Sequence, residues 1–296
     1  MKIICIGASH FDVKAQLIAP LKMQSSNPAT TFFSKGGVIR NVAENLGRLS
    51  LDVNLVSLMG RDAKSDHLLQ LMQELGVNVD RVLRSDKSPT GTYTAILDQK
   101  GELILALADI GIYDEMKPSY CKKMDLQADY WMIDSSFPEE TLRWLCLNCP
   151  QKTKLWAMAI SPVKVIRWKT LLSHLDLLFL NHHELSALVK EGKDPRKKAK
   201  MLLKNGPKAV IVSEGEKGAF YLSCKEEYFS CSAEKVEVVD VTGAGDALAA
   251  GVLFGKTQGL SMQESLLCGL KAAALTIGVK ETVCPTISPQ ALMSAI

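Results

Sequence analysis

The chain has 296 residues, of which 47% are hydrophobic and 23% charged, and its formal net charge is +3. These values are ordinary for a soluble globular enzyme, and a charge this small, without a long basic run, excludes a nucleic-acid-binding surface. No stretch reaches ~18 consecutive apolar residues, so we expect no membrane span, and the length suits one large α/β domain with an insertion or two smaller domains.

The N-terminus and the cysteines indicate a cytoplasmic protein. Residues 1–7 are apolar but too short for a signal peptide, so they predict a buried first strand that ends in a glycine turn. The eight cysteines are scattered through apolar segments, which suits a reducing compartment. Cys146 and Cys149 form a C-x-x-C pair without a second pair or a histidine at zinc spacing, and we interpret them as ordinary helix cysteines.

Strand-like and helix-like segments alternate along the chain, which predicts a mostly parallel sheet covered by helices. The predicted strands are residues 2–8, 53–57, 81–84, 130–134, 155–159, 177–180 and 209–213, followed by a hairpin of 218–223 and 228–231. The predicted helices are residues 37–49, 64–75, 139–147, 184–190, 246–254 and 262–277, and the basic run 194–200 fits the solvated face of a further surface helix.

Two β-prone segments break this alternation, within residues 12–34 and 88–110. They stand where crossover helices are expected, and the second is split by a turn signal at residues 98–101. We therefore expect a single domain over residues 1–296 with a small β lid built from these segments. The alternative is that they extend the edge of the main sheet.

The most informative motif is residues 240–251, which read DVTGAGDALAAG. Small residues let the backbone approach a ligand, and the first N–H groups of the following helix lack internal partners and favour an anion. Asp246 at the mouth of such a site is placed to accept a proton from a substrate hydroxyl, as phosphoryl transfer to an alcohol requires. The alternative is an ordinary glycine turn that caps a core helix.

Other polar motifs fall near the predicted carboxyl ends of strands, where α/β sheets bind ligands. Gly36 and Gly37 precede a helix that carries Asn41 in its first turn, and Asp12 follows the first strand. An acid, an amide and bare backbone suit a polyhydroxylated substrate, although for Asp12 alone a turn cap is nearly as good an interpretation.

Two further motifs follow later strands. Asn181 and Glu184 suit either the organisation of a hydrated Mg²⁺ or the capping of a helix, and the sequence leaves both open. Ser213, Gly215 and Gly218 join a strand to the hairpin, and the two glycines suit the cradling of a nucleotide phosphate.

Taken in this order, the motifs resemble those of the ribokinase-like (PfkB) carbohydrate and nucleoside kinases over essentially the whole chain. The resemblance implies a Rossmann-type three-layer α/β/α domain with a small β-sheet lid, and it implies ATP and Mg²⁺ as cofactors. By this resemblance Asp246 is the catalytic base and Gly243, Ala244 and Gly245 form the anion hole. The remaining implied roles are phosphate binding for Thr242, Ser213, Gly215 and Gly218, organisation of Mg²⁺ for Asn181 and Glu184, and substrate binding for Asp12, Gly36, Gly37 and Asn41.

Within the family, residues 26–46 and 93–110 resemble the pseudouridine kinases. This resemblance implies transfer of the γ-phosphoryl group of ATP to the 5′-hydroxyl of pseudouridine, with Asn27 and Asp109 as contacts to the base or ribose, or alternatively as lid-turn caps. Met158 and Ala159 stand where we expect an Asp-Pro pair in that subgroup, so kinases for ribose, fructose or an ordinary nucleoside stay as alternatives.

Several points stay open at the level of sequence. A monovalent cation near Asp240 and residues 279–284 is one, and a homodimer formed through the exposed edges of the β lid is another. An oxidoreductase is disfavoured because the turn after the first strand lacks G-x-G-x-x-G, and a non-catalytic regulator is disfavoured by the intact Asp246.

Overall fold

The computed structural model describes all 296 residues, and its core is an eight-stranded sheet. Six neighbouring strands are parallel, in the spatial order β4 (Asp52–Val56), β1 (Lys2–Ile6), β9 (Tyr130–Asp134), β10 (Lys154–Met158), β11 (Leu177–Asn181) and β12 (Ala209–Ser213). The antiparallel strands β13 (Ala219–Ser223) and β14 (Tyr228–Cys231) complete the sheet beside β12 and form the predicted hairpin.

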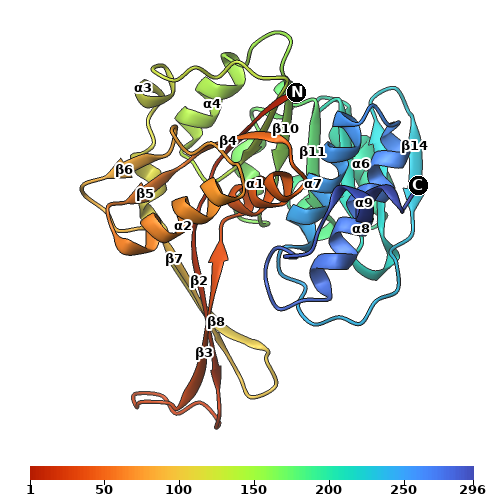
Figure 1. Ribbon diagram of the computed structural model, residues 1–296. Helices are drawn as coiled ribbons and strands as arrows, with labels where there is room; N and C mark the ends of the chain where they lie inside the picture. The colour runs from red at the N-terminus through yellow and green to blue at the C-terminus, as the bar shows by residue number, and fades with distance from the viewer.

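Helices cover both faces of this sheet, because its strands are apolar on both sides (Figure 1). In β1, Ile3 and Cys5 point to one face while Ile4 and Ile6 point to the other. The Ile3 face packs against α1 (Val38–Arg48), α2 (Ala63–Glu74), α7 (Ala244–Thr257) and α8 (Met262–Ile277). The Ile4 face packs against α3 (Pro118–Cys121), α4 (Glu139–Leu147), α5 (His182–Leu188) and α6 (Pro195–Leu203). The predicted three-layer α/β/α architecture is confirmed.

The two β-prone segments form a separate four-stranded sheet that projects from the body (Figure 1). Its spatial order is β3 (Ala29–Gly36), β2 (His10–Leu17), β7 (Thr92–Leu97) and β8 (Leu103–Asp109). The predicted turn lies between β7 and β8, where the Asp98 N–H donates to the Glu102 carbonyl at 2.8 Å. These strands therefore form a lid sheet and do not extend the main sheet.

Some short elements differ from the sequence-based expectation. The strand expected at residues 81–84 is β6 (Leu83–Ser85), which pairs with β5 (Leu58–Gly60) in a small sheet of its own. Helices α5 and α7 each begin two residues earlier than predicted, and α3 and α9 (Pro289–Met293) were not predicted because segments of four or five residues show no helical period. All eight cysteines are free thiols. None of the helices combines the length and the apolar character that a membrane span needs.

The chain topology brings the lid and two helix N-termini to one edge of the sheet. Strand β1 leads into β2 of the lid, and β3 returns directly into α1. The Arg40 N–H of α1 donates to the Ala8 carbonyl just after β1 at 3.2 Å. Helix α7 packs beside α1 on the same face. This edge therefore collects the polar motifs of the sequence.

Candidate active site

The N-terminus of α7 presents backbone N–H groups to open space. Gly243 caps the helix with φ of 84°, and a Cβ there would lie 2.0 Å from the Thr282 carbonyl oxygen, so only glycine fits the turn. The N–H groups of Gly243, Gly245 and Asp246 donate to no protein acceptor, whereas the Ala244 N–H donates to the Val241 carbonyl at 3.3 Å. Three free donors at a helix N-terminus are suited to an anion such as a phosphoryl group.

Asp246 is held beside these donors as a buried carboxylate. Asp246 lies in the first turn of α7, and only 8% of its surface is exposed. The Asn41 side-chain N–H donates to Asp246 Oδ2 at 2.6 Å. Burial raises the pKa of Asp246 to about 7, even though the Asn41 hydrogen bond and the Arg40 charge act in the opposite direction. A carboxyl with this pKa can accept a proton near neutral pH and release it again.

Arg40 fixes the orientation of the Asn41 amide. Its guanidinium is fully buried, pairs with Glu44 one turn along α1, and donates to the Asn41 side-chain oxygen. It also donates to the Thr282 hydroxyl oxygen at 3.2 Å. Because the Asn41 oxygen is occupied in this way, its NH₂ group is the one that faces Asp246.

The glycine pair and Asp12 lie directly next to this network. The Asp12 carboxylate sits over Gly36, where a Cβ would lie 2.3 Å from Asp12 Oδ1. The Arg40 Nε–H donates to the Gly36 carbonyl at 3.2 Å, and the charge of Asp12 raises the pKa of both Arg40 and Asp246. Asp12, Gly36, Gly37 and Asn41 are thus brought together at the mouth of the site, as the sequence predicts.

A second polar cluster, which the sequence did not reveal, lies at the ends of β1 and β9. The buried Asp134 carboxylate accepts from the N–H groups of Ala8 at 3.0 Å and Ser136 at 2.8 Å. The hydroxyls of Ser9 and Ser136 are buried without a hydrogen-bond partner. The Lys164 backbone N–H donates to Ser161 Oγ at 3.3 Å, but its side-chain ammonium makes no ion pair or hydrogen bond; burial lowers the pKa of Lys164, and the charge of Asp134 opposes this. Unpartnered polar groups of this kind are expected where a ligand completes them.

Asp134 places a carboxylate next to Met158, the position where an Asp-Pro pair was expected. Met158 ends β10 and is buried in the core, and its direct neighbour across the sheet is Asp134 at the end of β9. The edge therefore carries a carboxylate even though the expected Asp-Pro pair is missing. The position of Asp134 at a strand end is the one signal in the sequence that marks it as a candidate.

Asn181 and Glu184 form the capping box of α5. The Asn181 side-chain oxygen accepts from the N–H groups of His183 and Glu184, both at 2.9 Å, and Glu184 Oε2 accepts from the Asn181 N–H at 2.8 Å. Glu184 Oε1 takes no hydrogen bond, and burial raises the pKa of this carboxyl. No group of three or more His, Cys, Asp and Glu side chains is placed to hold a metal ion. One carboxylate with a free oxygen still fits Mg²⁺, which keeps several waters and takes other ligands from phosphates.

The predicted nucleotide motif lies beside this cap. Ser213 at the end of β12 pairs with Asn181 in the register of the sheet. Gly215 has φ of 63° with no atom within 4 Å of a hypothetical Cβ, so its backbone is open to a ligand. Gly218 packs tightly, because a Cβ there would lie 2.1 Å from the Cys231 carbonyl oxygen.

The turn before α7 contacts the lid sheet. Asp240 Oδ1 accepts from the N–H and the hydroxyl of Thr242, at 2.9 and 2.6 Å. Lys14 of β2 donates to Asp240 Oδ2 at 2.5 Å and to the Thr242 hydroxyl at 3.1 Å. Both carboxylate oxygens of Asp240 therefore accept hydrogen bonds, and the Lys14 ammonium lies beside the carboxylate for which the sequence left a monovalent cation open.

The two predicted substrate contacts of the lid lie at opposite ends of it. Asn27 is in the long turn between β2 and β3, where its side chain bonds the backbone of Lys22 and Ser25. Because β2 and β3 pair over eight residues, this turn is roughly 25 Å along the lid from Gly36. Asp109 ends β8 at the base of the lid, paired with Thr92, and is exposed.

The chain was compared with known proteins. The model of the family described as "pfkB family carbohydrate kinase" matches residues 1–288. The chain is 27% identical to the pseudouridine kinase of Escherichia coli (strain K12), covering 99% of this chain and 96% of that protein. It is 29% identical to the guanosine-inosine kinase of Exiguobacterium acetylicum, covering 95% of each. The solved structure of a carbohydrate kinase from Agrobacterium tumefaciens is 30% identical and superposes with a TM-score of 0.85, covering 100% of this chain and 97% of that one.

The burial of Asp246 predicts a pH-dependent gain in stability for Asp246→Asn. Between pH values of about 4 and 7 the folded chain holds a proton that an unfolded Asp releases, so the wild type loses stability as the pH rises through this range and then levels off. Asn cannot ionise, so the variant avoids this loss. We expect the variant to be more stable than the wild type at pH 8, by at most about 4 kcal/mol, and this gap to close toward pH 4.

The measurement is denaturant unfolding at a series of pH values, with the exposed surface substitution Asp86→Asn as the control. No gain at pH 8, or the same pH trend in the control, contradicts the buried-carboxylate interpretation.

Proposed function

We propose that this chain, which belongs to the pfkB family of carbohydrate kinases and is an ATP-dependent phosphotransferase, phosphorylates the 5′-hydroxyl of pseudouridine. The observation that carries the proposal is the Asp246 carboxylate, held by Asn41 beside three free N–H groups. The two curated relatives described above are named as kinases of nucleosides, which supports a nucleoside as the acceptor.

The chemistry follows from the placement of Asp246. The acceptor oxygen attacks the γ-phosphorus of ATP, its proton passes to the Asp246 carboxylate, and the bond to the β-phosphate oxygen breaks to release ADP. The free N–H groups of Gly243, Gly245 and Asp246 stabilise the charge on the transferring group. Ala244 contributes its small size, since its own N–H is engaged. We also propose that closure of the lid over this edge excludes water.

Mg²⁺ and the phosphates fit the neighbouring strand ends. Glu184, positioned by its capping bond to Asn181, offers one free oxygen to a hydrated ion. When bound, Mg²⁺ supplies positive charge to the β- and γ-phosphates. We assign the binding of the ATP phosphates to three residues between the α5 cap and the proposed anion hole: Ser213, Gly215 and Thr242.

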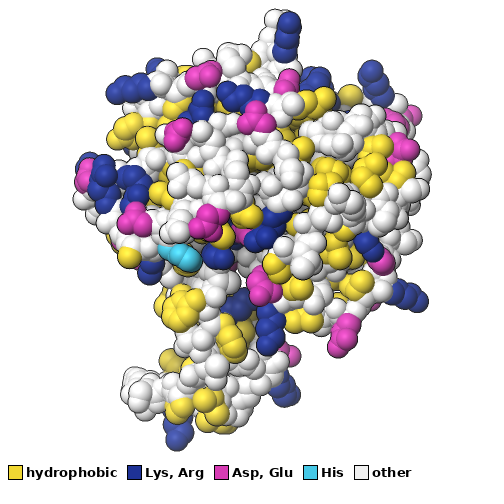
Figure 2. Space-filling view, viewed as in Figure 1, with side chains coloured by type: hydrophobic (Ala, Val, Ile, Leu, Met, Phe, Trp, Pro, Cys, Tyr) yellow, Lys and Arg dark blue, Asp and Glu magenta, His cyan; other side chains and the backbone are white.

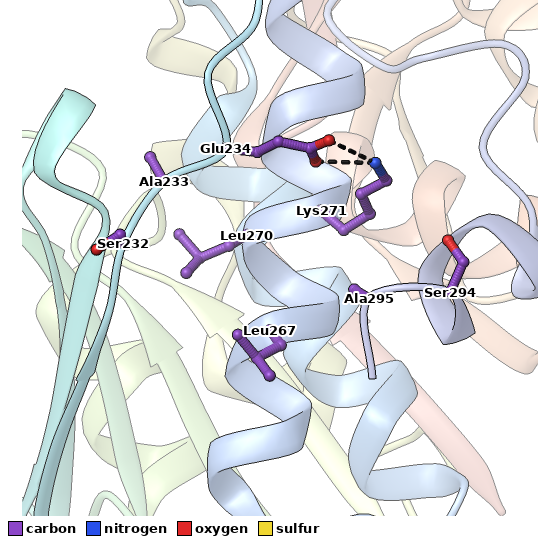
Figure 3. A pocket seen from close by; sticks show the side chains of 8 residues that line it. All are labelled: Ser232, Ala233, Glu234, Leu267, Leu270, Lys271, Ser294 and Ala295. Atoms are coloured by element: carbon purple, nitrogen blue, oxygen red, sulfur yellow. Dashed lines mark hydrogen bonds and ion pairs between the residues drawn. The ribbon is translucent and has the colours of Figure 1, made fainter.

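We assign the ATP base to a cavity of about 270 Å³ beside α8 (Figure 3). The segment after β14 forms one wall of the cavity and packs against Gly218, then runs on to the anion hole. On the way from β14 to Gly243, the Val239 N–H donates to the carbonyl of Ile277, the last residue of α8, at 2.8 Å. Leu270, which lines the cavity, lies on the same helix roughly 10 Å from Ile277. Figure 3 shows Glu234 and Lys271 paired across the rim. The lining residues are Ser232, Ala233, Glu234, Leu267, Leu270, Lys271, Ser294 and Ala295.

We assign the acceptor to the other side of Asp246. Asp12, Gly36, Gly37 and Asn41 fit the ribose hydroxyls, and the Ser9, Ser136 and Lys164 cluster fits the base. Lys164 can donate to a uracil carbonyl, and a serine hydroxyl can accept from the ring N–H that pseudouridine has and uridine lacks. A site with unpartnered polar groups rejects analogues that leave them unpaired. Asp109 at the base of the lid is the other candidate contact, and no contact is assigned to Asn27.

The alternative is a sugar kinase or an ordinary nucleoside kinase of the same family. The 30% identity to a solved carbohydrate kinase favours a sugar. The unpartnered polar cluster favours an acceptor larger than ribose, because ribose alone leaves its groups unfilled.

An assay of ADP release with ATP and Mg²⁺ tests the proposal across pseudouridine, uridine, cytidine, guanosine, ribose and fructose. We expect the highest kcat/KM on pseudouridine and a kcat for Asp246→Asn at least about 100-fold lower with similar substrate affinity. Preference for a sugar or for another nucleoside would overturn the acceptor assignment, and near-normal turnover by Asp246→Asn would overturn the base.

Two matched variants separate the donor site from the acceptor site. Lys164→Met removes the charge beside the proposed base site, so we expect about a 10-fold or larger rise in KM for pseudouridine with little change in KM for ATP. Leu270→Trp fills the cavity beside α8, and we expect the reverse pattern. Steady-state kinetics with each substrate varied in turn gives the result, and a change in the same KM for both variants contradicts the assignment.

We propose in addition that two copies pair through their lids. All seven residues of β8 are exposed, and Leu103, Leu107 and Phe33 are each more than half exposed. Figure 2 shows hydrophobic side chains over the lid where it projects below the body. An apolar edge strand of this length invites pairing unless it is covered.

Light scattering coupled to size-exclusion chromatography tests this pairing. We expect a dimer for the wild type and a monomer for Leu107→Lys. The control is Leu147→Lys, at a similarly exposed leucine on the body, which we expect to leave the dimer intact. A monomeric wild type contradicts the proposal.

A further inference from the structure

Lys14 makes the one ion pair between the lid strands and the rest of the chain. It lies in the middle of β2, and its ammonium reaches Asp240 and Thr242, which are 226 and 228 residues away along the chain. Its side chain is 28% exposed and that of Asp240 is 26% exposed, so the pair is screened from solvent more than a surface pair is. The contact therefore joins the lid to the turn that leads into the anion hole.

Asp240 in turn shapes that turn. Its Oδ1 accepts both the N–H and the hydroxyl of Thr242, the residue before the free Gly243 N–H. Burial alone raises the pKa of Asp240, but the hydrogen bonds from Lys14 and Thr242 outweigh it and hold the pKa below its usual range. The turn thus keeps a full negative charge, and Lys14 supplies the matching positive charge.

A lysine ammonium and a dissolved monovalent cation each place one compact positive charge beside the Asp240 carboxylate oxygens. Thr242 fills both acceptor positions of Oδ1, and the Lys14 ammonium lies 2.5 Å from Oδ2. A second cation at this carboxylate would therefore be repelled by the charge of Lys14.

We propose that Lys14 is the resident cation of the Asp240–Thr242 turn, so that the anion hole does not depend on a dissolved monovalent cation. Lys14 is a positioning residue: it acts on the transferring phosphoryl group through Asp240, Thr242 and the Gly243 N–H. This inference rests on the proposed kinase function. Since Lys14 belongs to the lid, the turn has its full charge balance only while the lid is docked.

The experiment compares K⁺, Na⁺ and choline chlorides at constant ionic strength. The readouts are kcat, with whichever acceptor the substrate assay identifies, and the melting temperature, which needs no acceptor. For the wild type we expect kcat within about two-fold across the three salts, and an unchanged melting temperature, since equal ionic strength gives equal screening.

Lys14→Met vacates Asp240 Oδ2. We expect its kcat to fall by about 10-fold or more in choline chloride, and K⁺ to restore part of this loss and raise the melting temperature. Lys100→Met is the matched control, because Lys100 lies in the exposed turn between β7 and β8, and it should behave as the wild type. Lys14→Gln, which retains a hydrogen-bond donor without charge, gives the same comparison if the methionine variant does not fold.

Two results would overturn the inference. One is a wild-type kcat that drops 10-fold or more in choline chloride and recovers with K⁺. The other is a Lys14 variant whose kcat and melting temperature respond to the salts as Lys100→Met does. The melting-temperature arm stands without turnover, so failure of the kinase proposal is distinguishable from failure of this one.

Discussion

The site depends on one costly arrangement, the burial of the Asp246 carboxylate at the start of α7. Moving a charge out of water is unfavourable, and here three features offset it: the N-terminal end of the helix, the Asn41 hydrogen bond and the nearby Arg40 charge. Each feature constrains the fold. Helix α1 must lie beside α7, Gly243 must turn with a positive φ, and Arg40 must be buried with Glu44 as its partner.

The insertion of the lid follows the same logic. The lid strands leave the body directly after β1 and return directly before α1, so its base carries Asp12, Gly36 and Gly37 to within reach of Asn41. At mid-length the lid touches the body again, through Lys14 and Asp240. The lid sheet therefore contacts both regions that we assign to the reaction: the proposed acceptor site at its base and the turn before Gly243 at its middle.

Much of this was readable from the sequence because local patterns carry it. Alternation of strands and helices indicated the three layers, and the glycines around Asp246 and Asn41 marked the two segments to which we assign the anion hole and the acceptor. Residues 181–184 show the limit: the same Asn and Glu that suggest a metal motif form a capping box, and the sequence leaves both readings open. Lys14 and Lys164 were missed because nothing local distinguishes them, and their contacts join distant segments. Asp134 has only its place at the end of β9 as a local signal, and its contact with Ala8 comes from tertiary structure. The pKa of Asp246 near 7 likewise comes from tertiary burial.

The most direct test of the central claim is the pH dependence of phosphoryl transfer in a single turnover. If the Asp246 carboxylate takes the proton from the substrate hydroxyl, the rate constant rises with pH and levels off above an apparent pKa near 7. This is the value to which burial raises the pKa of Asp246. A rate constant that stays flat from pH 5.5 to 8.5 in the same measurement would contradict the account, because the buried carboxyl would then play no part in the chemical step.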